Sequence, residues 1–109
     1  MQMRLGRLEK RHERGIPVSI SSLRQPVVNE KLNTENFSPR GLRVLTLYAR
    51  RRDEIVEITL ETTKQERLAR VVYCEKLSNG KYGIGLEIIG DPIDWAAEMK
   101  SAPSIDSRG

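Results

Sequence analysis

The sequence predicts a small, mainly β domain, built as a barrel or sandwich of short antiparallel strands, with a basic N-terminal arm and a short C-terminal helix. Two observations lead to this fold class. From residue 42 onward, β-branched and aliphatic residues alternate with polar ones at the period of two that a half-buried strand requires. In addition, the pair Asn79-Gly80 lies between two apolar runs, and this is the strongest short-range signal of a β-hairpin.

The first fourteen residues form the basic arm. Five cationic side chains against Glu9 and Glu13 give these residues a net charge of +3, out of +4 for the whole chain. Arginines recur at steps of three and four from Arg4 to Arg14, so they would line one face of a helix. Gly15 and Pro17 would end any such helix. We expect residues 1–14 to be flexible and to suit an anionic partner, such as a nucleotide, a nucleic acid or a membrane surface.

Five segments carry the composition of strands, and one long segment between them does not. The expected strands are Val18–Leu23, Leu42–Tyr48, Ile55–Glu61, Leu68–Glu75 and Tyr82–Ile88. The polar stretch Asn29–Pro39 favours a loop, and loops carry function more often than the strands they connect. Gly83 and Gly85 lie inside a strand pattern and do not open a helix, so they indicate a close backbone contact within a sheet rather than a phosphate-binding loop.

The C-terminal part of the chain carries a helix-start signal. Asp91 and Pro92 suit the N-cap and the first helical position of a short helix through Trp95 and Met99. We expect the Trp95 side chain to close the barrel or sheet. The domain therefore covers residues 15–100, and the small and polar residues 101–109 are expected to be a disordered tail.

Length and composition exclude several classes of protein. A chain of 109 residues has room for one core, which excludes a multidomain enzyme, and its 38% hydrophobic and 31% charged residues are typical of a soluble globular domain. No apolar run approaches the length of a membrane span, and the N-terminus is charged, so we expect a cytoplasmic protein without membrane insertion. A single cysteine and a single histidine leave no internal disulfide and no structural zinc site.

No catalytic arrangement stands out. Ser38 has no nearby histidine to activate it, and Cys74 lies in a strand pattern that favours a buried, unreactive thiol. Most carboxylates fall on the solvent faces of the expected strands, where paired acid and base chemistry is disfavoured. The run Arg50-Arg51-Arg52 indicates a charged loop tip rather than a site. We therefore expect that the protein is not an enzyme and needs no cofactor.

Two short motifs resemble those of a known family. Lys10-Arg11-His12-Glu13-Arg14 precedes the strand that begins Pro17-Val18-Ser19-Ile20, and Asn36-x-Ser38-x-x-Gly41 follows. From about Lys10 to Ile88 the chain resembles the PilZ domain, a six-stranded antiparallel β-barrel whose bacterial members commonly bind the second messenger cyclic di-GMP. The serine motif matches fully. For the arginine motif, Lys10 to Arg14 has the right spacing with lysine in first place, Arg11 to Arg14 is one residue short, and Arg7 to Arg11 has both arginines but lies further from the strand.

The resemblance implies a ligand-binding site with two parts. Its residues would be Lys10, Arg11 and Arg14 of the arm together with Asn36, Ser38 and Gly41. An arginine fork can hold a phosphate, or the O6 and N7 edge of a guanine, through two bonds, which lysine cannot do. Asn36 and Ser38 can read a second guanine edge, and Gly41 permits a close backbone approach or a positive φ. Asn36 and Ser38 also suit ordinary turns, and the arm arginines a solvated face.

These observations favour one function over two others. The first hypothesis is a stand-alone PilZ-like signalling module that binds cyclic di-GMP and acts as an adaptor, relaying the signal by contact with an unidentified effector protein. The alternative is a degenerate PilZ-like barrel that does not bind the nucleotide and acts only as a protein-interaction adaptor. A barrel that binds single-stranded nucleic acid is disfavoured, because only 5% of the residues are aromatic and a stacking platform needs more.

Overall fold

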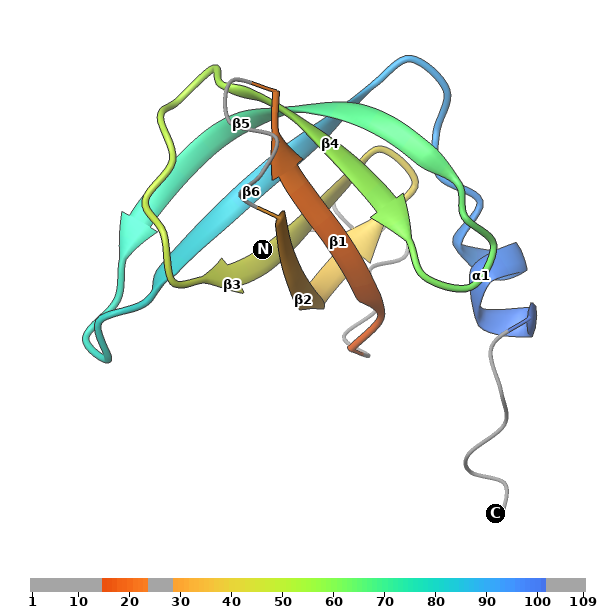
Figure 1. Cartoon of the computed structure of the whole chain (residues 1–109), viewed down its shortest axis with the longest axis horizontal. Coiled ribbons are helices and arrows are strands. Elements are labelled where there is room, and N and C mark those ends of the chain that lie inside the picture. Colours follow the sequence, from red (N-terminus) through yellow and green to blue (C-terminus); the bar gives the residue numbers. More distant parts are fainter. Residues whose placement is uncertain (1–14, 24–28, 102–109) are drawn as a thin grey trace, which may run out of the picture.

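Six antiparallel strands close into one barrel, and a short helix follows the last strand (Figure 1). The computed structural model describes residues 15–23 and 29–101, and the strands follow one another around the barrel in the order β1-β2-β3-β6-β5-β4. The elements are β1 (Pro17–Ser22), β2 (Asn29–Ser38), β3 (Gly41–Thr46), β4 (Ile55–Leu60), β5 (Glu66–Lys76), β6 (Tyr82–Ile89) and α1 (Trp95–Ser101). The prediction of a small, mainly β barrel with a C-terminal helix is confirmed.

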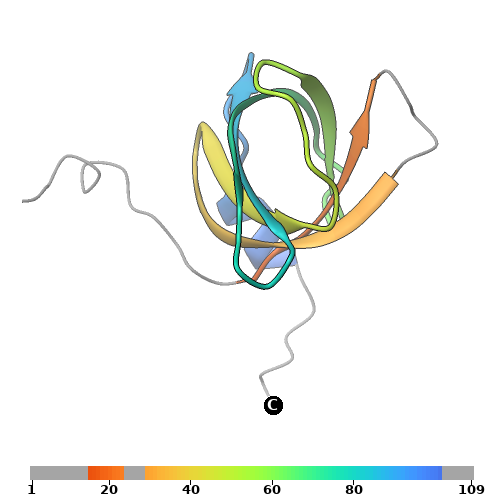
Figure 2. The same cartoon turned by 90° about the vertical axis from the view of Figure 1, so that its left-hand side faces the viewer.

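The interior of the barrel holds the hydrophobic core. Every strand contributes side chains to it, and the view along the barrel in Figure 2 shows the strands enclosing this space. In β4 the predicted alternation is confirmed, because Val56, Ile58 and Leu60 are buried while the residues between them are half-buried. The Asn79-Gly80 hairpin between β5 and β6 is confirmed as well. Gly80 has a φ of 84°, and the Asn79 side chain accepts a hydrogen bond from the Lys81 amide at 3.0 Å.

The predicted loop at Asn29–Pro39 is wrong, because residues 29–38 form strand β2. The strand was missed because two of its three buried side chains, Glu30 and Thr34, are polar. Their polar atoms have partners inside the barrel: for example, the Thr34 hydroxyl accepts a hydrogen bond from the Ile16 amide at 3.0 Å. A β-bulge between Thr34 and Asn36 shifts the register, so that Phe37 is the next side chain to point inward.

Helix α1 begins at Trp95, later than the predicted start at Asp91 and Pro92. Asp94 is the N-cap instead, since its carboxylate accepts a hydrogen bond from the Ala97 amide at 2.9 Å. The predicted closing role of Trp95 is confirmed: the side chain is 5% exposed and its ring stacks on Phe37 with the ring centroids 4.2 Å apart.

Glu98 fastens the helix to the turn between β4 and β5. Its carboxylate is 1% exposed and accepts hydrogen bonds from the amides of Thr62 and Thr63, both at 2.9 Å, and from the Thr63 hydroxyl at 2.8 Å. Burial by itself would raise the pKa of Glu98, but these hydrogen bonds to the charged form outweigh it, so the pKa lies below its usual value.

Two further predictions need correction. Arg50 is not part of an exposed loop tip, because its side chain is buried between two glutamates, whereas Arg51 and Arg52 are exposed as expected. Cys74 is partly rather than fully buried and packs against the core. The predicted flexible arm, its possible helix and the disordered tail lie outside the described residues, apart from Ser101, which ends α1. None of the described helices has the length and apolar character needed to cross a membrane.

Candidate functional site

The structure brings Asn36, Ser38 and Gly41 together on the hairpin of β2 and β3. Ser38 pairs with Gly41 across the hairpin, and Asn36 pairs with Arg43. Phe37, between Asn36 and Ser38, points into the core, so its two half-buried neighbours lie on the outer face of the barrel. The motif therefore forms one small polar surface on the outside of the barrel.

This surface continues across the two neighbouring strands. Strand β3 pairs with β6, placing Gly85 beside Arg43 and Glu87 beside Gly41. Strand β5 extends these pairings into two rows of neighbours across the sheet, because Tyr73 lies next to Gly85 and Arg70 lies next to Glu87. We call the outer surface of β2, β3, β6 and β5 around these rows the site face.

The two glycines of β6 make room for large side chains on the site face. A Cβ atom at Gly85 would overlap the ring of Tyr73, and one at Gly83 would overlap the guanidinium of Arg43. The predicted close contact at these glycines is confirmed, but the partners are side chains lying across the strand and not another backbone.

Gly41 is required by a backbone contact. A Cβ atom at this position would lie 3.0 Å from the Leu86 carbonyl oxygen of β6, which is tighter than an ordinary contact. Gly41 does not adopt the left-handed conformation, which among the described residues is found at Asp53, Lys64, Gly80 and Gly90. Of the two predicted roles, the structure therefore supports close backbone approach, and the approach is to a neighbouring strand.

The C-terminal segment holds the end of this hairpin in place. The Trp95 indole N–H donates a hydrogen bond to the Ser38 carbonyl at 2.7 Å, and the Ile93 amide donates one to the Pro39 carbonyl at 3.0 Å. Because Trp95 also stacks on Phe37, the backbone of Ser38 is tied directly to the first residue of α1. The sequence motif contained no sign of this link.

Arg43 is the best-connected cation of the site face. Its guanidinium contacts the Glu35 carboxylate at 2.6 Å, the Glu75 carboxylate at 2.9 Å and the Tyr73 hydroxyl at 3.0 Å. Its carbon atom also lies 5.7 Å from the centre of the Tyr73 ring. The hydrogen bonds to Tyr73 and Glu35 raise the pKa of Arg43 further above its already high value. Arg43 is therefore charged and shared between two carboxylates.

Arg70 has the same kind of environment. It pairs with Asp53 at 2.9 Å and with Glu87. These ion pairs are partly exposed and so contribute little to stability, but they do neutralise the cations of the site face. A ligand with two phosphates would therefore need additional positive charge from outside these rows.

The described part of the chain begins at Gly15, beside β2. The predicted ligand residues of the arm, Lys10, Arg11 and Arg14, lie outside the described residues, so the structure does not place them. Gly15, the first described residue, packs against Asn33, with 3.5 Å between its ideal Cβ position and the Asn33 Cβ. The Thr34 amide also donates a hydrogen bond to the Ile16 carbonyl at 3.0 Å. The start of the barrel is thus fixed to β2, three residues before Asn36 along that strand.

Comparison with known proteins finds similarity in structure but not in sequence. No protein-family model and no curated protein sequence matches the chain. Among the described residues, no group of three or more His, Cys, Asp or Glu side chains could hold a metal ion.

Two solved structures share the fold. One is the inhibitor of motility MotI/DgrA of Bacillus subtilis, with a TM-score of 0.65 and 17% identity over 99% of this chain. The chain spans about half of that protein, covering 52% of it. The other is the PilZ domain of CeSA from a cellulose-synthesizing bacterium, with a TM-score of 0.54 and 21% identity over 84% of this chain and 90% of that one. The barrel described here therefore has the PilZ fold.

Proposed function

We propose that this chain is a cyclic di-GMP-binding module that passes the signal on by protein contact. The observation that carries the proposal is the grouping of Asn36, Ser38 and Gly41 on the outer face of a PilZ-fold barrel. The fold alone hosts many functions, so the proposal depends on this motif and on the chemistry of its residues. As a binding module, the protein would not act as an enzyme.

Guanine recognition is assigned to the hairpin. A guanine edge presents both acceptors and donors, and the Asn36 amide and Ser38 hydroxyl can each donate and accept. Both side chains are half-buried and lie on strand β2, whose backbone is fixed by the barrel and by the hydrogen bond from Trp95. Such a preformed site lowers the ordering cost of binding.

Phosphate binding is assigned to the arm. Arg43 and Arg70 are already shared among carboxylates, so the two phosphates need Lys10, Arg11 and Arg14. Lys10, the furthest of the three, is five residues from Gly15, and an extended chain of that length spans up to roughly 18 Å. Because Gly15 lies beside β2, the arm can fold over the site face. Bound ligand would then order the arm and change the surface that a partner protein meets.

Calorimetric titration with cyclic di-GMP at near-physiological salt tests this proposal, with cyclic di-AMP and GTP as competitors. Micromolar or tighter binding selective for cyclic di-GMP is expected. Arg14→Ala and Ser38→Ala should each weaken it at least tenfold, because each removes a direct contact, without lowering the melting temperature by more than a few degrees.

Two matched variants serve as controls. Arg4→Ala removes the same charge from the arm but lies outside the motif, and Ser78→Ala removes a hydroxyl on the turn between β5 and β6; neither should change affinity. If no heat and no thermal stabilisation appear at high ligand concentration, the nucleotide-binding proposal is wrong and the protein-interaction alternative replaces it.

A further inference from the structure

The loop between β3 and β4, residues 47–54, exposes two consecutive large apolar side chains. Leu47 is 65% exposed and Tyr48 is 54% exposed, the two highest values for large apolar residues in the described part of the chain. Single exposed apolar residues are common on protein surfaces, but a consecutive pair on one loop marks a candidate contact surface. We call residues 47–52 the contact loop.

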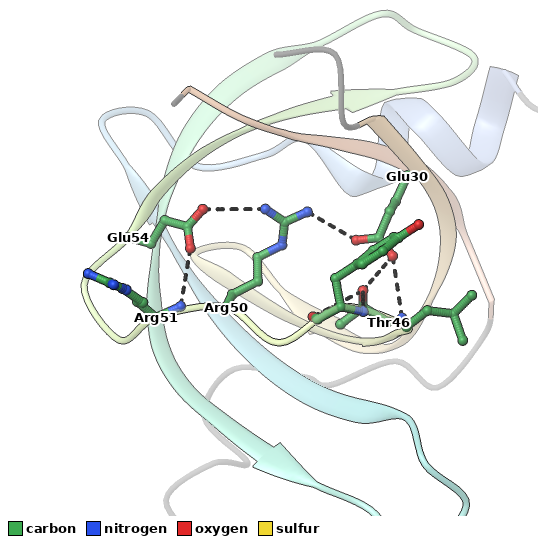
Figure 3. A network of polar contacts seen from close by, with 7 residues as sticks. Glu30, Thr46, Arg50, Arg51 and Glu54 are labelled. Atoms are coloured by element: carbon green, nitrogen blue, oxygen red, sulfur yellow. Dashed lines mark hydrogen bonds and ion pairs between the residues drawn. The ribbon is translucent and has the colours of Figure 1, made fainter. Parts of the chain in front are cut away.

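A buried ionic network fixes this loop to the barrel. Figure 3 shows the Arg50 side chain pointing back from the loop and reaching Glu54 on one side and Glu30 of β2 on the other. The nitrogen–oxygen distances are 3.0 Å to Glu30 and 3.4 Å to Glu54, and the Arg50 side chain is only 5% exposed. Glu30 also accepts hydrogen bonds from the Thr46 hydroxyl and from the Leu47 amide.

Hydrogen bonds also fix the second half of the loop, residues 51–54. Glu54 accepts a hydrogen bond from the Arg51 amide at 3.1 Å, and the amides of Asp53 and Val71 bond to the carbonyls of Val71 and Glu54 at 2.7 and 2.9 Å. Buried ion pairs seldom add stability over well-packed apolar residues, and their better-supported use is to specify one conformation. The network therefore presents Leu47 and Tyr48 in a fixed arrangement, which lowers the ordering cost of binding a partner.

The charge of the loop indicates the chemistry of the partner. Arg51 and Arg52 are exposed, whereas the two carboxylates that follow them are engaged, Asp53 by Arg70 and Glu54 by Arg50. The contact loop thus combines a net positive charge with two apolar side chains. Arg52 is five positions after Leu47, so these features lie within roughly 18 Å of each other along the backbone. A partner protein that fits would present an apolar strip bordered by carboxylates.

We propose that the contact loop is a docking surface for an acidic, amphipathic segment of a partner protein. This inference names the surface for the protein contact in the proposed function, but it does not depend on nucleotide binding. Two exposed cations are fewer than the four to eight that commonly mark a segment binding anionic lipid. A second copy of this chain is disfavoured, because a twofold contact through this loop would bring like charges together.

The test measures fluorescence anisotropy of a labelled 16-residue helical peptide with leucines on one face and glutamates on the other, titrated with the full chain without nucleotide. A peptide with lysine in place of each glutamate is the reference. We expect the acidic peptide to bind at micromolar concentration, at least tenfold more tightly than the lysine peptide. Affinity should fall as salt is raised.

Variants locate the surface. The double variants Leu47→Ser/Tyr48→Ser and Arg51→Glu/Arg52→Glu should each weaken binding of the acidic peptide at least tenfold. Two matched controls should leave it unchanged. Leu68→Ser/Ile89→Ser removes the exposed apolar pair that faces across β5 and β6, and Lys76→Glu/Lys81→Glu reverses two exposed cations near the opposite hairpin.

Several outcomes would overturn the docking proposal. These are absence of peptide binding at millimolar concentration, equal affinity for both peptides, or equal loss in the control variants. Binding to phosphatidylglycerol vesicles without peptide binding would assign the loop to a lipid surface. A dimer that the loop variants dissociate would assign it to a second copy. Because no nucleotide is present, each of these results is distinct from a failure of cyclic di-GMP binding.

Discussion

Replacing Arg50 by methionine removes the cation from the buried network and leaves Glu30 without its charge partner. The Glu30 carboxylate is 8% exposed, and breaking a buried pair of this kind costs about 3–5 kcal/mol. Glu30 keeps its hydrogen bonds from the Thr46 hydroxyl and the Leu47 amide, which places the expected loss at the lower end, about 3 kcal/mol. For a domain of this size, that loss lowers the melting temperature by roughly 12–24 °C.

Urea unfolding measures this effect in the wild type, in Arg50→Met and in the double variant Glu30→Met/Arg50→Met. The three proteins should share one m-value, so that differences in midpoint report differences in stability. The double variant should recover most of the loss, since replacing both members of a buried pair by apolar residues is often close to neutral. A loss below about 1 kcal/mol in the single variant would contradict a buried, structurally important pair. A double variant no more stable than the single one would contradict the attribution to an uncompensated Glu30 charge.

Three further perturbations test other parts of the structure. Gly85→Ala forces the ring of Tyr73 to move and should lower the free energy of unfolding by about 1–3 kcal/mol in thermal unfolding; adding Tyr73→Ala should relieve this strain. Trp95→Phe keeps the aromatic packing but loses the bond to the Ser38 carbonyl, so urea unfolding should show a loss of about 1 kcal/mol. Because folding lowers the pKa of Glu98, its carboxylate stabilises the fold above the unfolded pKa, and this stabilisation disappears as the pH falls through the folded pKa. The stability difference between wild type and Glu98→Gln should therefore shrink in acid, and a difference independent of pH would contradict this assignment.

The sequence predicted the elements whose signals are local. The alternation of residues 55–61 marked β4, and the Asn79-Gly80 pair marked the hairpin of β5 and β6. Strand β2 could not be recognised from its hydrophobic pattern, because the partners of buried Glu30 are Thr46, Leu47 and Arg50, which lie 16 to 20 residues away. The periodicity of apolar residues cannot show that a polar side chain is buried when its hydrogen-bond partners come from a distant part of the chain.

The start of α1 depended on a distant contact in the same way. Asp91 with Pro92 and Asp94 both suit an N-cap, and the structure uses Asp94. The Gln65 side chain bonds to both the amide and the carbonyl of Asp94, each at 2.9 Å, and so fixes the chain at this point. No local signal distinguishes the two aspartates.

The sequence predicted the motif residues of the candidate site but not the side chains that surround them. The motif grouped Asn36, Ser38 and Gly41 in one site, but Asn36 and Ser38 were expected in a loop and lie on the hairpin of β2 and β3 instead. The sequence did not reveal that Arg43 is shared between carboxylates or that Ser38 is bound by Trp95. Both features arise because the closed barrel brings β5 and the C-terminal segment against the hairpin, and such pairings depend on the whole topology.

The most direct test of the central claim is a nuclear magnetic resonance titration of the full ¹⁵N-labelled chain with cyclic di-GMP. The account predicts saturable shifts in the amide signals of Asn36, Ser38 and Gly41 together with those of the arm around Arg14, and no such shifts with cyclic di-AMP. Unchanged signals at saturating nucleotide, or changes confined to surfaces away from β2 and β3, would contradict it.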